Sequence, residues 1–315
     1  MKVIFNADDF GLTRAVNAGI MEAYEHGLLK SASLMVTAEA ADDAVAWAKA
    51  RPGLDVGLHI TLIEERPTLP PEQIPSLVTD GRFYPRRGTV FFRYAIGRWD
   101  VAEAEAEIAA QWNRLLGSGL EPSHLDGHQH LHLLPWLFPS VIALAQGHGI
   151  RFVRTRLGDP VAGAGSLARK MSVLAINKIS RLNWAKIPDP DGLAMIPFTT
   201  VGFLQSGGAL TVSSLMATLD QLRGDQGQGI VEVMIHPGRC DAETERKYGH
   251  WRYRWESDLG LLLDPTLPEA LAQRGIVVTS FRELHLQTDK TIAGRSFGVD
   301  NTPQASVDFP RSPCE

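Results

Sequence analysis

Cysteine is scarce in this 315-residue sequence, and a surplus of positive charge is missing. The two cysteines, Cys240 and Cys314, are far apart, so they indicate neither a disulfide framework nor a zinc knuckle. The formal net charge is −5 at pH 7. Because proteins that bind nucleic acid usually carry a basic excess, we expect no nucleic-acid partner.

Long apolar runs are missing as well. No apolar stretch approaches the roughly 18 residues that indicate a membrane-spanning helix. The N-terminus enters a predicted strand at once, without the charged and apolar regions of a secretory signal, so we expect a cytoplasmic protein. Hydrophobic residues nevertheless make up 44% of the chain, which suits the core of a globular protein.

The first part of the chain alternates apolar runs with amphipathic ones. Strands are predicted at 2–6, 32–37 and 55–60, and helices at 14–28 and 39–50. This order favours parallel strands joined by helices. A Rossmann sheet would need a G-x-G-x-x-G motif after the first strand, and none is there. We therefore predict an α/β fold of the (β/α)-barrel type.

The rest of the chain continues this alternation with one interruption. Residues 63–99 hold several prolines and an aromatic cluster, and we expect a long loop that either walls a cleft or packs on the surface. Further strands are predicted at 123–125, 151–154, 194–196, 230–235 and 276–279, and further helices at 101–117, 135–148, 167–184, 210–223, 255–263 and 268–274. We predict a single domain at 1–286 and a disordered tail at 287–315.

The predicted helix at 167–184 is both basic and apolar. One stripe of it contains Leu167, Met171, Leu174, Ala175, Lys178, Ile179 and Leu182, and the other cations, Arg169, Lys170 and Arg181, lie off that stripe. Such a helix could rest on a membrane surface or cover a lipid-like ligand. It could equally pack on the core or on the second subunit of a homodimer.

Polar residues gather where the predicted strands end. They are Asp8 and Asp9 after the first strand, His59 at the third, Asp126 and His128 at the fourth, Arg154 and Arg156 at the fifth, and His236 after the strand at 230–235. In a (β/α) barrel these ends share one rim, where active sites are built. A lone histidine at a strand end is more often structural, but convergence from five strands is hard to explain by packing.

These residue types suit metal-assisted hydrolysis. One carboxylate and two histidines can hold a divalent ion with open positions, and such an ion polarises a carbonyl and acidifies a bound water. A second carboxylate can accept the proton of that water, and a histidine opposite can protonate the leaving group. We take His128 as a ligand because it is nearest the strand end, and we expect His130 and His132 behind the ligands or at the rim.

Four motifs resemble the YdjC/ChbG-like carbohydrate deacetylase family. They are Asn6–Gly11 (NADDFG), Gly57–Leu62 (GLHITL), His124–His132 (HLDGHQHLH) and His236–Gly238 (HPG), and their order covers the chain from residue 1 to about 285. Within the family, the chain most resembles the hopanoid-biosynthesis-associated branch called HpnK.

The resemblance implies an irregular TIM-like barrel that removes acetyl groups from an N-acetylated sugar. Asp9, His59 and His128 would bind one divalent metal ion (zinc, magnesium, nickel or cobalt). Asp8 would be the general base, a division from Asp9 that could be reversed, and His236 the general acid. The HpnK branch implies an N-acetylglucosaminyl hopanoid lipid as substrate and contact with the inner membrane face. On position alone, Asp126, His130, Arg154 and Arg156 are candidates for substrate contacts.

Three other functions stay open at this point. The first is deacetylation of soluble chito-oligosaccharides. The second is a metal-dependent phosphoesterase on a similar barrel, which would usually need a second metal. The third is a non-catalytic sugar- or lipid-binding barrel, which would need neither the base Asp8 nor the acid His236.

Overall fold

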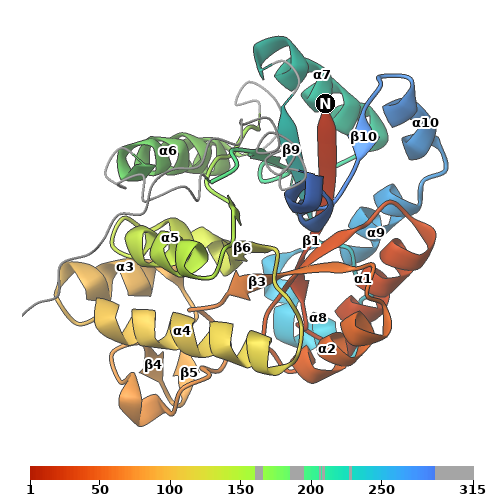
Figure 1. Ribbon diagram of the computed structural model, residues 1–315. Helices are drawn as coiled ribbons and strands as arrows, with labels where there is room; N and C mark the ends of the chain where they lie inside the picture. The colour runs from red at the N-terminus through yellow and green to blue at the C-terminus, as the bar shows by residue number, and fades with distance from the viewer. Residues whose placement is uncertain (160–165, 185–194, 206, 208–209, 227–228, 288–315) are drawn as a thin grey trace, which may run out of the picture.

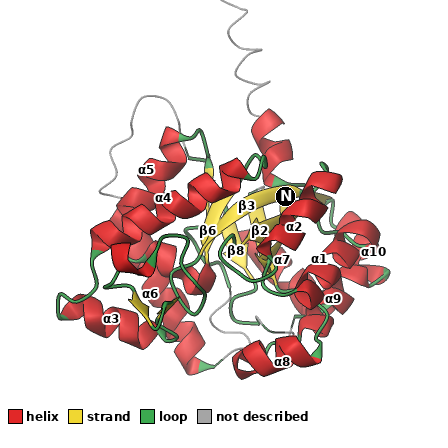
Figure 2. Cartoon of the chain, turned by 90° about the horizontal axis from the view of Figure 1, so that it is seen from below, coloured by secondary structure: helices red, strands yellow, loops and turns green. Residues whose placement is uncertain are grey.

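The computed structural model describes residues 1–159, 166–184, 195–205, 207, 210–226 and 229–287. In these residues the chain folds around one curled parallel sheet, with helices around it (Figures 1 and 2). The strands of the sheet are β1 (Lys2–Phe10), β2 (Ser31–Leu34), β3 (Asp55–Ile60), β6 (His124–Gly127), β7 (Phe152–Val153), β8 (Thr199–Val201), β9 (Ile230–Ile235) and β10 (Val277–Val278). Their order is β7-β6-β3-β2-β1-β9-β8, and β10 pairs with the start of β1.

Hydrogen bonds beyond the two edge strands, β7 and β8, join the edges of the sheet. Leu157, just after β7, forms a parallel bridge with Thr200 of β8. The N–H of Thr200 donates to the carbonyl oxygen of Arg156 at 2.8 Å, and the N–H of Gly158 donates to that of Thr200 at 2.7 Å. The described residues therefore form one α/β domain with an irregular, TIM-like barrel, as the sequence predicts.

Helices connect the strands and cover the outside of the barrel. They are α1 (Arg14–His26), α2 (Ala41–Ala50), α4 (Val101–Gly117), α5 (Phe138–Gly147), α6 (Leu167–Trp184), α7 (Val212–Gln226), α8 (Ala242–Tyr248), α9 (Trp255–Leu263) and α10 (Thr266–Ala272). In α4 the spacing of Ala104, Ile108 and Trp112 buries one face, and Asp100 caps the first turn by accepting from the N–H of Ala102.

The segment predicted as a long loop, 63–99, contains more regular structure than expected. It forms the 3-10 turn η1 (Pro71–Gln73), a hairpin of β4 (Val78–Thr79) and β5 (Arg82–Phe83), and the helix α3 (Arg87–Ala95). The hairpin turns at Asp80 and Gly81, whose φ angles are 50° and 73°. An Asp-Gly pair favours this turn, and the prolines around it obscured the signal.

Other boundaries differ in detail. β1 continues past the predicted end at residue 6 and includes both aspartates. Residues 195 and 196 of the predicted strand at 194–196 are not in a strand, and the nearby strand is β8. Residue 194 and the tail from 288 onward lie outside the described residues. The predicted bounds of α4, α6, β3 and β9 are confirmed.

Helix α6 turns its predicted apolar stripe outward. Leu167, Met171 and Leu174 are 75%, 57% and 50% exposed, whereas Val173 on the other side is buried against Leu157 and Leu204. The core therefore takes the smaller apolar face and leaves the larger one uncovered by the described residues. None of the described helices is both long enough and apolar enough to cross a membrane.

Candidate metal centre and active site

The two aspartates near the end of β1 both face the site. The register of β1 against β2 shifts between Ala7 and Phe10, and Asp9 has a φ of 62°. In a regular strand neighbouring side chains point to opposite faces, but a bulge re-aims one of them. As a result Asp8 and Asp9 each lie within ligand distance of His59, in two overlapping groups of polar side chains.

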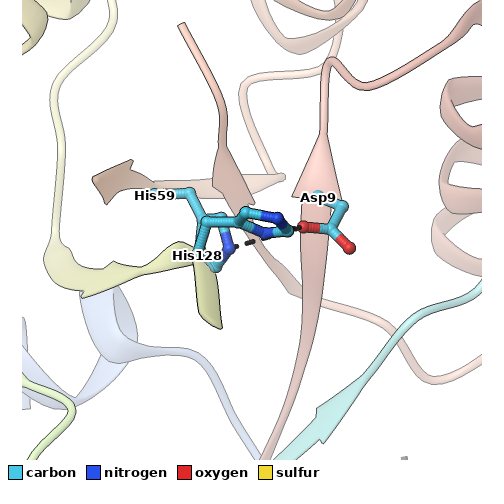
Figure 3. A group of neighbouring side chains, drawn as sticks. All are labelled: Asp9, His59 and His128. Carbon is cyan, nitrogen blue, oxygen red and sulfur yellow. Dashed lines mark hydrogen bonds and ion pairs between the residues drawn. The ribbon is translucent and has the colours of Figure 1, made fainter. Parts of the chain in front are cut away.

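The first group brings together Asp9, His59 and His128 (Figure 3). Oδ1 of Asp9 lies 3.0 Å from Nδ1 of His128 and 3.5 Å from Nε2 of His59. The two imidazole rings reach this carboxylate from β3 and from the 3-10 segment η2 (His128–Leu133) that follows β6. All three side chains are buried. The structure thus assembles the predicted ligand set at the predicted strand ends.

The donor set fits a divalent metal ion. Oδ2 of Asp9 is buried and has no hydrogen-bond partner among the described residues. A buried carboxylate oxygen without a partner is costly, and a cation beside it would remove that cost. One carboxylate oxygen and two imidazole nitrogens are ordinary ligands for zinc, nickel or cobalt. These three residues could therefore hold one ion.

Each histidine of this group has a second carboxylate behind it. Nδ1 of His59 lies 2.8 Å from Oδ1 of Asp126, and Nε2 of His128 lies 3.3 Å from Oε2 of Glu64. Asp126 is therefore placed behind a histidine rather than toward the open side of the site. Glu64 was not predicted as a site residue, because nothing in its local sequence distinguishes it from a surface acid.

Burial and neighbouring charges shift the pKa values of all three residues of the group strongly. Burial opposes the charged imidazolium of His59, but Asp126 and Asp9 outweigh it and raise its pKa to about 10. For His128, burial is likewise outweighed by Asp9 and Glu64, and the pKa is raised to about 9. Burial would raise the pKa of Asp9, but His128 and His59 hold it well below its usual range.

Arg154, directly after β7, organises the second group. Its Nη1 and Nη2 donate to Oδ2 and Oδ1 of Asp8, both at 2.7 Å, and it also contacts Glu232 of β9 at 2.6 Å and Asp126 at 2.7 Å. Its side chain is only 1% exposed. The sequence suggested that Arg154 contacts substrate, but its guanidinium is instead surrounded by three carboxylates, which argues against a direct sugar contact.

The same arginine bears on the phosphoesterase alternative. Asp8, His59 and Asp126 form the second overlapping group that could hold an ion. The guanidinium of Arg154 already provides positive charge to both aspartates of this group. A second metal there would have to displace it, so this arrangement favours one metal over two.

His236, after β9, lies on another side of the site. Its backbone N–H donates to Oδ2 of Asp258 at 3.1 Å, and its ring packs on Tyr253 with centroids 4.6 Å apart. Burial lowers the pKa of His236 below its usual value, and the nearby charges of Asp9 and Asp8 oppose this only in part. A buried imidazole that interacts with both aspartates is a suitable group for proton transfer.

The remaining candidates are spread out. His130 is 9% exposed and packs against Phe203, with ring centroids 5.2 Å apart, and burial holds its pKa well below the usual range. His132 is fully buried, and its Nε2 lies 2.8 Å from the carbonyl oxygen of Arg154. Arg156 is exposed, and its backbone belongs to the barrel closure. Glu232 was missed, although a glutamate inside an apolar strand was a visible signal.

The group of Asp9, His59 and His128 is called the metal group below. A cavity of about 680 Å³ adjoins it on the side of Glu64. Its lining includes Glu64, Glu65, Arg66, Arg82 and Tyr248. Within it, the hydroxyl of Tyr248 donates to Oε1 of Glu65 at 2.7 Å. Polar groups of both charges together with an aromatic ring suit a polar organic ligand.

Comparisons with known proteins agree on one family. The family model described as YdjC-like protein matches residues 2–273. A carbohydrate deacetylase of Geobacillus stearothermophilus is 33% identical over 282 residues, which cover 90% of this chain and 97% of that protein. A chitooligosaccharide deacetylase of Serratia marcescens is 31% identical over 289 residues, with 90% and 98% covered.

A solved structure has the same fold. It is the crystal structure of a protein from Enterococcus faecalis V583 that is provisionally named a cellobiose-phosphate cleavage protein. It superposes with a TM-score of 0.68 at 25% identity and covers 90% of this chain and 98% of its own.

Proposed function

This chain belongs to the YdjC-like protein family, and from that membership and the site we propose that it is a metal-dependent carbohydrate N-deacetylase. The observation that carries the proposal is the buried group of Asp9, His59 and His128, in which Oδ2 of Asp9 has no hydrogen-bond partner among the described residues. A metal ion held there would polarise the acetyl carbonyl and acidify a water. Hydrolysis would then yield acetate and a free amino sugar.

We assign the general base to Asp8. Its Oδ1 accepts from Nδ2 of Asn6 at 3.1 Å and from Arg154, whereas its Oδ2 accepts from Arg154 alone among the described residues. A carboxylate oxygen can accept two hydrogen bonds, so Oδ2 keeps a lone pair for the attacking water. Arg154 fixes the direction of that lone pair, because its two contacts prevent the carboxylate from rotating.

We assign the general acid to His236. Its ring packs on Tyr253, and its backbone N–H is bonded to Asp258. His236 directly follows β9, whereas Asp8 lies in β1, so the two groups come from neighbouring strands. Protonation of the departing amine by His236 would complete the cleavage of the amide bond, with the proton from water left on Asp8.

The test is acetate release with and without a chelator, in the wild type and in Asp8→Asn. We expect release that the chelator abolishes, and a fall on the order of 10²- to 10⁴-fold in Asp8→Asn with its metal retained, because it loses the base but not the ligands. Thermal unfolding checks that the variant is folded. Loss of metal from a folded Asp8→Asn would show that the two aspartates have exchanged roles, and no release by metal-loaded wild type would overturn the activity.

We infer further that the N-acetylated sugar is attached to a lipid, as in an N-acetylglucosaminyl hopanoid. Two exposed apolar helices, α3 and α6, support this, and Figures 1 and 2 place them on the same side of the molecule. Phe91 and Phe92 of α3 are 45% and 63% exposed, and these exposed fractions are similar to those of the apolar side chains on the outer stripe of α6. Residues 82–98 and 167–184 contain arginines and lysines but no acidic residue, which suits an anionic membrane surface.

Helix α6 contacts η2, the segment that carries His128, and α3 contacts a residue three positions after η2. Tyr94 of α3 stacks on Trp136 with ring centroids 3.6 Å apart, and α6 packs against η2. A lipid surface bound to these helices would therefore lie beside the metal group. The name of the Serratia relative supports the alternative of a soluble chito-oligosaccharide, for which the polar cavity beside Glu64 would provide the space.

Two substrates separate these alternatives: an N-acetylglucosaminyl lipid in vesicles that contain phosphatidylglycerol, and soluble N-acetyl-chitobiose. We expect release mainly from the lipid, and Leu174→Gln with Phe92→Gln should weaken sedimentation with vesicles without slowing turnover of soluble sugar. Release from chitobiose alone would remove the lipid proposal. A concentration-dependent dimer that buries α6 would assign that face to a second subunit.

A further inference from the structure

Glu64 is held in an unfavourable backbone conformation next to the metal group. It follows β3 by four residues, and its φ is 67°. A residue other than glycine in this left-handed backbone region costs on the order of 1 kcal/mol of folding free energy, so the surrounding contacts must compensate for that cost. Its side chain is only 11% exposed. Such strain at a partly buried carboxylate indicates that a specific position is required of it.

Four donors converge on the carboxylate of Glu64. Oε2 lies 3.3 Å from Nε2 of His128 and accepts from Nε2 of Gln129 at 2.9 Å. Oε1 accepts from Nε1 of Trp251 at 3.0 Å and lies 3.2 Å from Nε2 of His250. The first two belong to η2 and the last two to the 3-10 turn η3 (Gly249–Trp251). Glu64 therefore ties two separate segments to the end of β3.

The contact with His128 matches the one that Asp126 makes with His59. In His59, Nε2 faces Asp9 and Nδ1 faces Asp126. In His128, Nδ1 faces Asp9 and Nε2 faces Glu64. On both rings the nitrogen away from Asp9 is thus held by a carboxylate. This arrangement fixes the tautomer and the orientation of a ligating imidazole and strengthens it as a donor.

We propose that Glu64 is a positioning residue for the metal, acting through His128. The inference rests on the proposed function, because it takes His128 as a ligand. Among the described residues, the hydrogen bonds and ion pairs of Glu64 include His128 but neither Asp9 nor His59, so its effect on the ion passes through one ring. The contacts of His250 and Trp251 with Glu64 hold η3 beside His128. The ring of Trp251 packs against the ring of His128, with centroids 5.1 Å apart, and so covers that imidazole from another side.

The test is the metal affinity of Glu64→Gln, measured by competition with a chromogenic chelator for Zn²⁺. The glutamine amide would face donors that converge on the carboxylate, and it carries no charge. We expect affinity to fall about 10- to 100-fold, and the visible spectrum of the Co²⁺ form to change.

Two control variants separate positioning from a general structural role. Glu65→Gln alters the neighbouring buried acid, which bonds Tyr248 instead of His128, and should stay within about twofold of the wild-type affinity. Trp251→Phe removes one of the two donors to Glu64 from η3 but keeps an aromatic ring beside His128, and it should also leave affinity nearly unchanged. Thermal unfolding of each metal-free variant checks the fold.

The outcomes distinguish this inference from the proposed activity. Equal Zn²⁺ affinity in wild type and Glu64→Gln, or equal losses in Glu64→Gln and Trp251→Phe, would overturn the positioning role and leave the deacetylase proposal intact. A selective loss in Glu64→Gln supports the positioning role even if the metal-loaded wild type releases no acetate, a result that would overturn the activity alone.

Discussion

The metal group lies between two walls that are built differently. The inner wall, formed by Asp8, Asp126, Arg154 and Glu232, is carried by barrel strands or their immediate ends and consists of buried charges. The outer wall, formed by Glu64, His250 and Trp251, is carried by loops and a 3-10 turn, and its key residue has a strained backbone. The inner wall places charge from the strands, whereas the outer wall holds one histidine from segments outside the sheet.

The largest expected effect comes from removing the cation of the inner wall. Arg154→Leu leaves three buried carboxylates without their common partner, and breaking such a cluster typically costs about 3–5 kcal/mol of unfolding free energy. Urea unfolding followed by circular dichroism measures this loss. The exposed Arg156→Leu serves as the control and should change stability by less than about 0.5 kcal/mol. Similar losses in both variants would contradict a special role for the inner wall.

A smaller effect should appear as pH falls, through a histidine bonded to the inner wall. Burial lowers the pKa of His132 from 6.5 to about 4, although its bond to the carbonyl oxygen of Arg154 opposes this. The unfolded chain binds the proton below pH 6.5 and the folded one only near pH 4, so stability is lost as pH falls through this window. For one group the loss at pH 5 is about 2 kcal/mol.

His132→Gln should remove this part of the pH dependence, because glutamine can still donate to the carbonyl but does not titrate. The unfolding free energies of both proteins, measured from pH 7 to pH 5, give the comparison. Parallel curves for the two proteins would mean that His132 does not contribute to acid sensitivity.

The smallest effect tests the strain of the outer wall. Glu64→Gly and Glu64→Ala both remove the carboxylate, but only glycine adopts a φ of 67° without cost. The glycine variant should therefore be more stable than the alanine variant by about 1 kcal/mol in chemical unfolding. A more stable alanine variant would indicate that the backbone relaxes and that the strain is absent.

The sequence predicted the inner wall better than the outer one, for physical reasons. Apolar runs and the 3.6-residue period located β3, β9 and α4, parallel strand ends then placed Asp9, His59 and His128 on one rim with other polar residues, and the family resemblance singled out these three. Arg154 was located correctly but misinterpreted, because its position does not reveal whether an arginine faces solvent or a buried carboxylate. Glu64 could not be recognised, since its partners lie on distant segments and its backbone angle has no local signature.

The central position of β1 has a consequence for how the chain is made. This first strand pairs with β2 early in the sequence but also with β9 and β10, which are formed by residues 230–235 and 277–278. During vectorial synthesis on the ribosome, one side of β1 must wait until most of the protein has emerged. The strand that carries Asp8 and Asp9 is thus translated before the other strands of the sheet, and its pairing is complete only after β9 and β10 have emerged.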